Sequence, residues 1–414
     1  MSLSSRRPLL AVYLTALSLI AASSSRATRM VWAADPAESP RVTVYDPNLN
    51  HLWNRLHEAL YVRLERKGQD DPGELDPFLW EHSPYRPFPW ERAPYREMQE
   101  RYKRAIAVLD DFISEEGNKL IADSRKRALL QRDLWVLFDT AAQSRWLVSP
   151  DKVDSEIELA RRAARIMSRL ALTADQIKAL PDNWSEAVAA GKLPDWFEAG
   201  RLWDADGPWV LLGSEDNVPL ARTHVELFCG RSAFFVFLRL PGARKQTLKY
   251  LADLRSNGNA AKSAQGAMFA LVRQMQLIDD HGRITLTPVI ESLQIRGFGN
   301  QEFKLSRKDF TAGKPSLVAI GPEDRERDFL TLLRRNAGHG RGKVLATCTS
   351  CHDPGTMQSY VRHLPPAQFI KPSLRASNRD EEALRARVWK KDRYEWGLLQ
   401  GLTLTRLREQ TEGH

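Results

Sequence analysis

The chain has 414 residues, 43% of them hydrophobic and 27% charged, so it can bury a core large enough for two or three globular domains. Its formal net charge is +9, and four of the arginines responsible lie in the first 33 residues, which contain no acid. The other basic residues alternate with acids, as in residues 97–104, which is typical of solvated helix faces. We therefore do not expect a nucleic-acid-binding protein.

The first 33 residues have the pattern of a secretory signal peptide. Arg6 and Arg7 precede an apolar run from Leu9 to Ala22, and Val31-Trp32-Ala33 offers residues that a signal peptidase accepts. The run is shorter than the roughly 20 residues that a membrane-spanning helix needs. We predict export to the periplasm or beyond in a bacterium, with no stable membrane span after cleavage; an uncleaved anchor is the alternative.

Residues 34–96 are predicted to form a tether and an extended arm with one helix near 52–60. Ser83-Pro84-Tyr85-Arg86 and Ala93-Pro94-Tyr95-Arg96 nearly repeat each other, and the prolines in this stretch exclude a regular helix. We expect the aromatic residues of the arm to pack against this same chain. A partner-binding arm is the alternative.

Residues 97–204 are predicted to form a helical domain. Apolar residues recur at helical spacing, as they do between Tyr102 and Phe112. Thr173 and Gln176 have the spacing of a capping box, which predicts the start of a further helix.

Residues 205–335 are predicted to form an α+β domain with a mostly antiparallel sheet. The run from Ala233 to Leu238 is apolar on both faces, which predicts a central strand. Asp279-Asp280-His281-Gly282 separates two strand-like runs and predicts a β-hairpin. Asp279 and Asp280 could also be read as a catalytic carboxylate pair, but turn chemistry explains them better.

The most informative motif is Cys348-Thr349-Ser350-Cys351-His352, which has the C-x-x-C-H spacing of covalent haem c attachment. Residues i, i+3 and i+4 share one face of a helix, so both thiols and the imidazole would face a single group. Each cysteine sulfur can add to one haem vinyl group, and His352 can then bind the iron as its proximal ligand.

Two other uses of these cysteines remain open. Cys348 and Cys351 could form a redox disulfide, or they could contribute to a zinc site, which normally has four ligands. The third cysteine, Cys229, is about 120 residues upstream and is expected to be a small buried residue. No structural disulfide is therefore predicted.

The C-x-x-C-H motif resembles the attachment site of c-type cytochromes, and residues 336–414 resemble their minimal plan of a helix before the motif and another at the end. This resemblance covers the motif and a lead-in helix. It implies one covalent haem c, held by Cys348 and Cys351 and ligated by His352.

The ligand on the other side of the iron is not settled by this resemblance. Met357 lies only five residues after His352, where a c-type cytochrome has its methionine much further along. His363 is the second local candidate. The remaining candidates are His414 at the C-terminus and two residues of the α+β region, His224 and Met275. The position could also be open or hold water.

The rest of the chain resembles uncharacterised exported bacterial proteins, through strings such as Leu202–Trp209 and Phe237–Gly242. This second resemblance covers much of residues 50–320 and implies no activity. No hydrolase or metalloprotease motif is present in the sequence. Whether the chain is an enzyme is left open, and an electron carrier or redox subunit is favoured.

The sequence as a whole predicts an α+β protein: an N-terminal helical domain, a middle α+β domain and a short helical haem segment. The favoured function is electron transfer to a redox partner protein of unknown kind. One alternative is a haem-based ligand sensor or a peroxidase-like protein. The other is an exported interaction or scaffold protein with zinc or no cofactor at C-x-x-C-H.

Overall fold

The computed structural model describes ten parts of the chain. They are residue 48 and residues 50–60, 62–64, 73–75, 95–144, 154–215, 218–257, 266–297, 301–320 and 374–412. The chain forms two compact units. In the smaller unit the described residues are β1 (Val62–Leu64) and β2 (Gly73–Leu75), a short antiparallel pair that the sequence did not predict.

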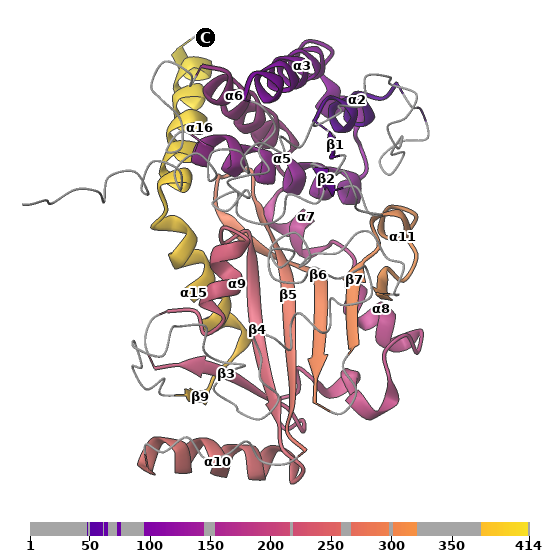
Figure 1. Ribbon diagram of the computed structural model, residues 1–414, viewed down its shortest axis with the longest axis vertical. Helices are drawn as coiled ribbons and strands as arrows, with labels where there is room; N and C mark the ends of the chain where they lie inside the picture. The colour runs from indigo at the N-terminus through magenta and orange to yellow at the C-terminus, as the bar shows by residue number, and fades with distance from the viewer. Residues whose placement is uncertain are drawn as a thin grey trace, which may run out of the picture. The chain divides into compact units, whose positions relative to one another are not determined.

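The larger unit contains a seven-stranded sheet, and all its described pairings are antiparallel (Figure 1). The strand order is β8-β7-β6-β5-β4-β3-β9. The strands are β3 (Val210–Ser214), β4 (Ser232–Arg239), β5 (Met268–Ile278), β6 (Ile284–Arg296), β7 (Gln301–Leu305), β8 (Leu317–Ala319) and β9 (Leu374–Ala376). The predicted α+β class and antiparallel sheet are confirmed.

The centre of the sheet follows the hydrophobic pattern of the sequence. Strand β4 is buried along nearly its whole length, and it pairs with β3 on one side and β5 on the other. Strands β5 and β6 form the predicted hairpin. In its turn, Asp279 accepts hydrogen bonds from the backbone N–H groups of His281 (3.0 Å) and Arg283 (2.8 Å), and Gly282 has φ 71°. Asp279 is therefore a turn residue.

Helices surround this sheet and form a layer at one end of it. Those before β3 are α2 (Leu52–Leu60), α3 (Tyr95–Ser114), α4 (Gly117–Leu120), α5 (Ser124–Ser144), α6 (Asp154–Leu170), α7 (Ala174–Lys178) and α8 (Asn183–Ala189), followed by the short 3₁₀ turns η5 (Asp195–Phe197) and η6 (Ala199–Arg201). Those after β3 are α9 (Arg222–Leu227), α10 (Ala243–Asn257), α11 (Arg307–Thr311), α15 (Arg379–Lys391) and α16 (Tyr394–Glu412). The predicted capping box of Thr173 and Gln176 is present at α7.

The helical region and the sheet share one hydrophobic core. A single buried cluster combines side chains of α2, α3, α5 and α6 with Met275 and Leu277 of β5 and Val289 of β6. In Figure 1, α3, α5 and α6 gather beyond one end of β4 and β5. The described residues on either side of position 204 thus lie in one compact unit, and the predicted domain boundaries stay predictions.

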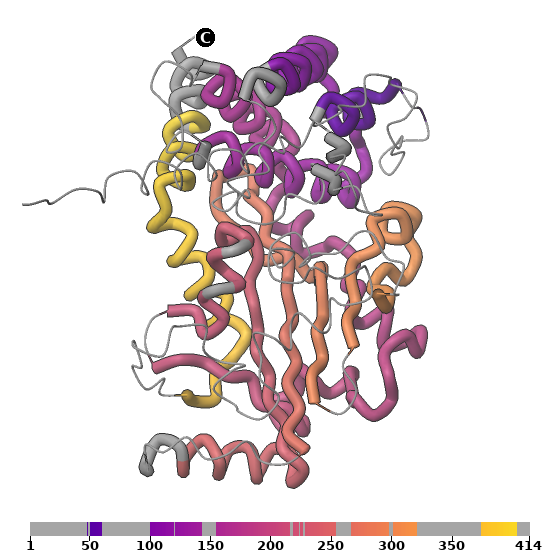
Figure 2. Tube along the Cα trace, viewed as in Figure 1, coloured from indigo at the N-terminus to yellow at the C-terminus, as the bar shows by residue number. Residues whose placement is uncertain are grey.

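The C-terminal residues are part of this same unit. The helix predicted at the end of the chain is present as α15 and α16, but the sequence did not predict that β9 pairs with β3 just before them. Helix α15 packs against β4, and α16 packs against α5 and α6. Figure 2 shows β9, α15 and the first part of α16 in yellow, running along the sheet toward the helical layer.

An ion pair fixes the junction between β9 and α15. The Arg375 guanidinium donates two hydrogen bonds to the Glu381 carboxylate, which also accepts one from the Ser377 hydroxyl at 3.0 Å. The hydrogen bond from Arg375 is the main cause that holds the pKa of Glu381 below its ordinary value. The charged form of Glu381 is therefore the one that the folded state prefers.

Asp279→Ala is expected to lower the free energy of unfolding by about 2–3 kcal/mol, because it leaves several donors of the hairpin turn without their acceptor. Urea denaturation measures this change. Asp280→Ala is the matched control, since the neighbouring Asp280 side chain is exposed and its loss should change stability by less than about 0.5 kcal/mol. Equal effects of the two substitutions would contradict the role given to Asp279.

Glu381→Gln is expected to destabilise the protein near neutral pH and to lose this effect in acid. A carboxyl group with a lowered folded-state pKa contributes stability above its unfolded pKa, and the contribution disappears as the pH falls through the folded pKa. Urea midpoints of parent and variant should therefore differ at pH 7 and converge toward pH 3. A difference that stays constant over this range would show that the charge of Glu381 is not responsible.

Candidate functional site

The residues that the sequence predicts as the functional site lie outside the described part of the chain. Cys348, Cys351 and His352 belong to the stretch 321–373, as do the two local candidates for the distal ligand, Met357 and His363. His414 is outside the described residues as well, and so is the predicted signal peptide. These predictions therefore stay predictions.

Two more distant candidates for the distal ligand are described. Met275 is almost fully buried within the shared hydrophobic core, on strand β5, so its thioether packs against core side chains. His224 lies on α9 and stacks on Phe234, with 5.6 Å between ring centroids. Met275 is thereby accounted for as a core residue, and His224 is a partly buried residue of the sheet surface.

Cys229 is buried, as the sequence predicts. It lies in the tight turn between α9 and β4 with φ 51°, and Gly230 follows with φ 66°. The thiol also forms a hydrogen bond with the Arg231 side chain, a contact that the sequence did not predict. Cys229 therefore adjoins one of two buried ionic groups that the structure brings together.

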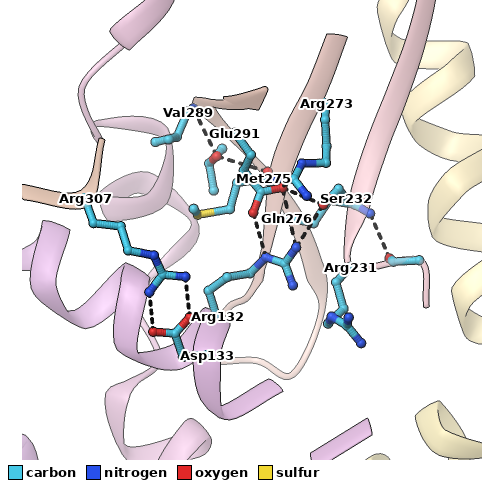
Figure 3. Close-up of polar contacts among 12 residues, drawn as sticks. Arg132, Asp133, Arg231, Ser232, Arg273, Met275, Gln276, Val289, Glu291 and Arg307 are labelled. Atoms are coloured by element: carbon cyan, nitrogen blue, oxygen red, sulfur yellow. Dashed lines mark hydrogen bonds and ion pairs between the residues drawn. The ribbon is translucent and has the colours of Figure 1, made fainter. Parts of the chain in front are cut away.

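The first ionic group centres on Glu291 of β6 (Figure 3). Arg132 of α5 donates to Glu291 from Nε at 2.9 Å and to the Ser232 hydroxyl from Nη2 at 3.0 Å. The Ser232 hydroxyl in turn donates to Glu291 at 2.5 Å, and Arg273 Nε lies 3.6 Å from the same carboxylate. All four side chains are buried, so this group ties α5 to three neighbouring strands.

The second ionic group centres on Asp139 of α5. Arg231 Nη1 donates to the carboxylate at 2.7 Å, and Lys390 Nζ of α15 lies 3.0 and 2.9 Å from its two oxygens. All three side chains are fully buried. Burial acts to lower the pKa of Arg231, but Cys229 and Asp139 outweigh it and raise this pKa above its ordinary value.

Cations outnumber carboxylates in these two groups by four to two, namely Arg132, Arg231, Arg273 and Lys390 against Asp139 and Glu291. Aromatic rings help to accommodate the excess, because a ring face attracts a cation. The Arg273 guanidinium lies 4.4 Å from the Phe228 ring centre, and the Lys390 ammonium lies 5.5 Å from that of Trp135.

We interpret the two groups as ties between elements. Each carboxylate is occupied by cations, and in the first group by a hydroxyl as well, so neither is poised as a general base. A third tie is partly buried: Arg307 of α11 binds both oxygens of Asp133 on α5, at 2.5 and 2.6 Å (Figure 3). Helix α5 is thus joined by charge to the sheet, to α11 and to α15.

The sequence carries a signal for only one of these ties. Asp139 follows the apolar run Trp135–Phe138, and an acid at the end of such a run in a helix indicates a buried partner. Its partner Lys390 is 251 residues away and sits in a charged stretch that reads as solvent-exposed. The pairing could not have been predicted from the sequence.

Comparisons with known proteins add no assignment. No family model matches the chain, and no curated protein and no solved structure matches it either. Among the described residues there is no cluster of three or more His, Cys, Asp or Glu side chains suited to a metal ion. In that same part of the chain, no helix combines the length and the apolar character that crossing a membrane requires.

Lys390→Ala is expected to lower the free energy of unfolding by about 3 kcal/mol, the lower end for a broken buried pair, because Arg231 still neutralises Asp139. Asp139→Ala should cost about 5 kcal/mol or prevent folding, since it leaves two buried cations. Urea denaturation provides both values. Lys391→Ala, at the exposed next position, is the control and should behave like the parent; a Lys390→Ala protein as stable as the parent would refute the tie.

Proposed function

We propose that the chain is an exported mono-haem protein of the c type that acts in electron transfer. The observation that carries this proposal is the C-x-x-C-H motif of Cys348, Cys351 and His352. The signal-peptide pattern at the N-terminus supports it, because haem c is attached to exported chains in bacteria. A bound haem would supply a reversible one-electron change at its iron.

The two thiols and the imidazole of the motif suit a covalently attached haem. Two thiols three residues apart match the two vinyl groups of one haem, and the adjacent imidazole is a common iron ligand. The only other cysteine of the sequence, Cys229, is buried beside Arg231 at the start of β4. Cys348 and Cys351 are thereby left as the pair for attachment, and His352 as the proximal ligand.

The topology of the described residues shows where the stretch with the motif joins the sheet. The motif lies between β8 and β9, and these are the two edge strands of the seven-stranded sheet. The stretch 321–373 is therefore anchored to the same compact unit at both ends, through Ile320 and Leu374. A haem attached there would be carried by the sheet-containing unit, which limits how far it can move from that unit.

Protein made in a bacterial host that is competent in cytochrome c maturation is expected to keep its haem through denaturing electrophoresis. A haem stain of the gel detects this, because only thioether-linked haem survives denaturation. Cys351→Ser should lose most of the stain, whereas Cys229→Ser, the matched control, should retain it. An unstained parent would refute the proposal and favour the scaffold alternative with zinc or no cofactor.

Carbon monoxide then separates electron transfer from ligand sensing or peroxidase-like chemistry. An electron carrier with two protein ligands on iron should leave the spectrum of the reduced protein unchanged when the gas is added. A spectral shift on addition of carbon monoxide would show an open position, and it would overturn the electron-transfer part of the proposal.

A further inference from the structure

Two neighbouring carboxyl groups at the start of α15 share one hydroxyl group. Ser377 Oγ lies 3.0 Å from Glu381 Oε2 and 2.8 Å from Glu382 Oε1. A hydroxyl group carries a single proton, so it donates to only one of these oxygens at a time. If both carboxyl groups are ionised, the other contact brings two acceptor oxygens together with no proton between them. We call Ser377, Glu381 and Glu382 the carboxyl cluster.

The two carboxyl groups have different surroundings. The Glu381 side chain is 29% exposed, and it accepts two hydrogen bonds from Arg375. The Glu382 side chain is only 2% exposed, and Arg385 Nη1 lies 2.8 Å from its Oε1. Arg385 is shared, because it also donates to Glu381 at 3.0 Å. Since burial penalises the charged form of a carboxyl group, ionisation is better supported at Glu381 than at Glu382.

Strand β3 closes off one side of the carboxyl cluster. A Cβ atom placed on Gly213 would lie 2.5 Å from Glu382 Oε1 and 2.8 Å from Ser377 Oγ. The absence of a side chain at this position lets the strand approach both groups closely. Ser377 is also held in place, because its backbone N–H donates to the Leu211 carbonyl of β3 at 2.9 Å.

Burial is the largest effect on the pKa of Glu382, and it raises this pKa above its ordinary value. The charge of Glu381 acts in the same direction, whereas Ser377 and Arg385 act against it. Ser377 acts in this way only when its proton points toward Glu382, and that proton is lost to Glu382 when Ser377 donates to Glu381. The charged residues around the cluster are Arg375 of β9, Arg385 of α15 and Glu215, which follows β3 and faces Arg375.

We propose that Glu382 binds a proton in mild acid and donates it to Ser377, which donates its own proton to Glu381, so that the carboxyl cluster makes the junction of β9 and α15 sensitive to pH. With this proton bound, each of the two oxygen–oxygen contacts contains one proton. When the pH rises and Glu382 ionises, its buried charge and the repulsion from Glu381 weaken the junction. The proposal does not depend on haem, because all the groups belong to the described polypeptide.

Infrared spectroscopy of the full-length protein tests for the proton. The carbonyl stretch of a protonated carboxyl group should persist to higher pH in the parent than in free glutamic acid, and Glu382→Gln should remove this signal. Its complete retention in Glu382→Gln would overturn the proposal.

Ser377→Ala reveals the direction of the hydrogen bond, with each spectrum compared with that of the same protein carrying Glu382→Gln. Under the proposal, Ser377 accepts from protonated Glu382, so its removal shifts the loss of the infrared signal to lower pH. A shift to higher pH would show that Ser377 donates to ionised Glu382, and it would overturn the proposal.

Urea denaturation tests the effect of this proton on stability. A carboxyl group with a raised folded-state pKa contributes stability below its unfolded pKa, and this contribution is lost as the pH rises through the folded pKa. Glu382→Gln stays neutral and keeps a donor, so its stability relative to the parent should increase from acid to neutral pH. Glu381→Gln, the matched control, should change in the opposite direction. A Glu382→Gln difference that is constant or falls with pH would contradict the proposal.

Amide hydrogen exchange, corrected for the intrinsic effect of pH, shows where the change occurs. Protection of the β9 amides and of the Ser377 N–H should fall several-fold from mildly acid to neutral pH in the parent, and should stay constant in Glu382→Gln. Strand β7, which pairs with β6, is the internal control and should not change. An equal loss of protection in β7 and β9 would mean that the whole unit loosens, and it would refute a device at this junction.

Discussion

The carboxylate of Asp139 holds together parts of the chain that are far apart in sequence. It binds Arg231, 92 residues away at the start of β4, and Lys390, 251 residues away on α15. All three groups are fully buried, so removing one partner leaves charge in a medium that solvates it poorly. Because Lys390 is fixed in this way, α15 and the strand β9 before it are fixed to the helical layer and the sheet.

This anchoring also fixes the point where the stretch with the C-x-x-C-H motif rejoins the sheet. The chain leaves the sheet after β8 at one edge and returns at β9 on the opposite edge, with Cys348 and Cys351 between. The return point is held three times: by pairing of β9 with β3, by the Arg375–Glu381 pair and by Lys390. A redox group carried on this stretch would be tethered to the larger unit at both ends.

Local features were predictable from the sequence, and long-range ones were not. A continuous apolar run predicted β4, and turn residues between two strand-like runs predicted the hairpin around Asp279. Thr173 with Gln176 predicted a helix start. Neighbouring residues determine all three features. The placement of β9 beside β3 and the pairing of Asp139 with Lys390 depend on contacts across more than 150 residues. The candidate site rests on five consecutive residues, and its motif could be read directly, whereas its distal ligand could not.

The measurement that tests the account most directly is mass spectrometry of the tryptic peptide from Val344 to Arg362, which contains both motif cysteines. The protein must come from a host that matures c-type cytochromes. The account predicts a peptide that carries the mass of one haem, with neither thiol available for alkylation. A peptide of unmodified mass, with both cysteines alkylated, would contradict it.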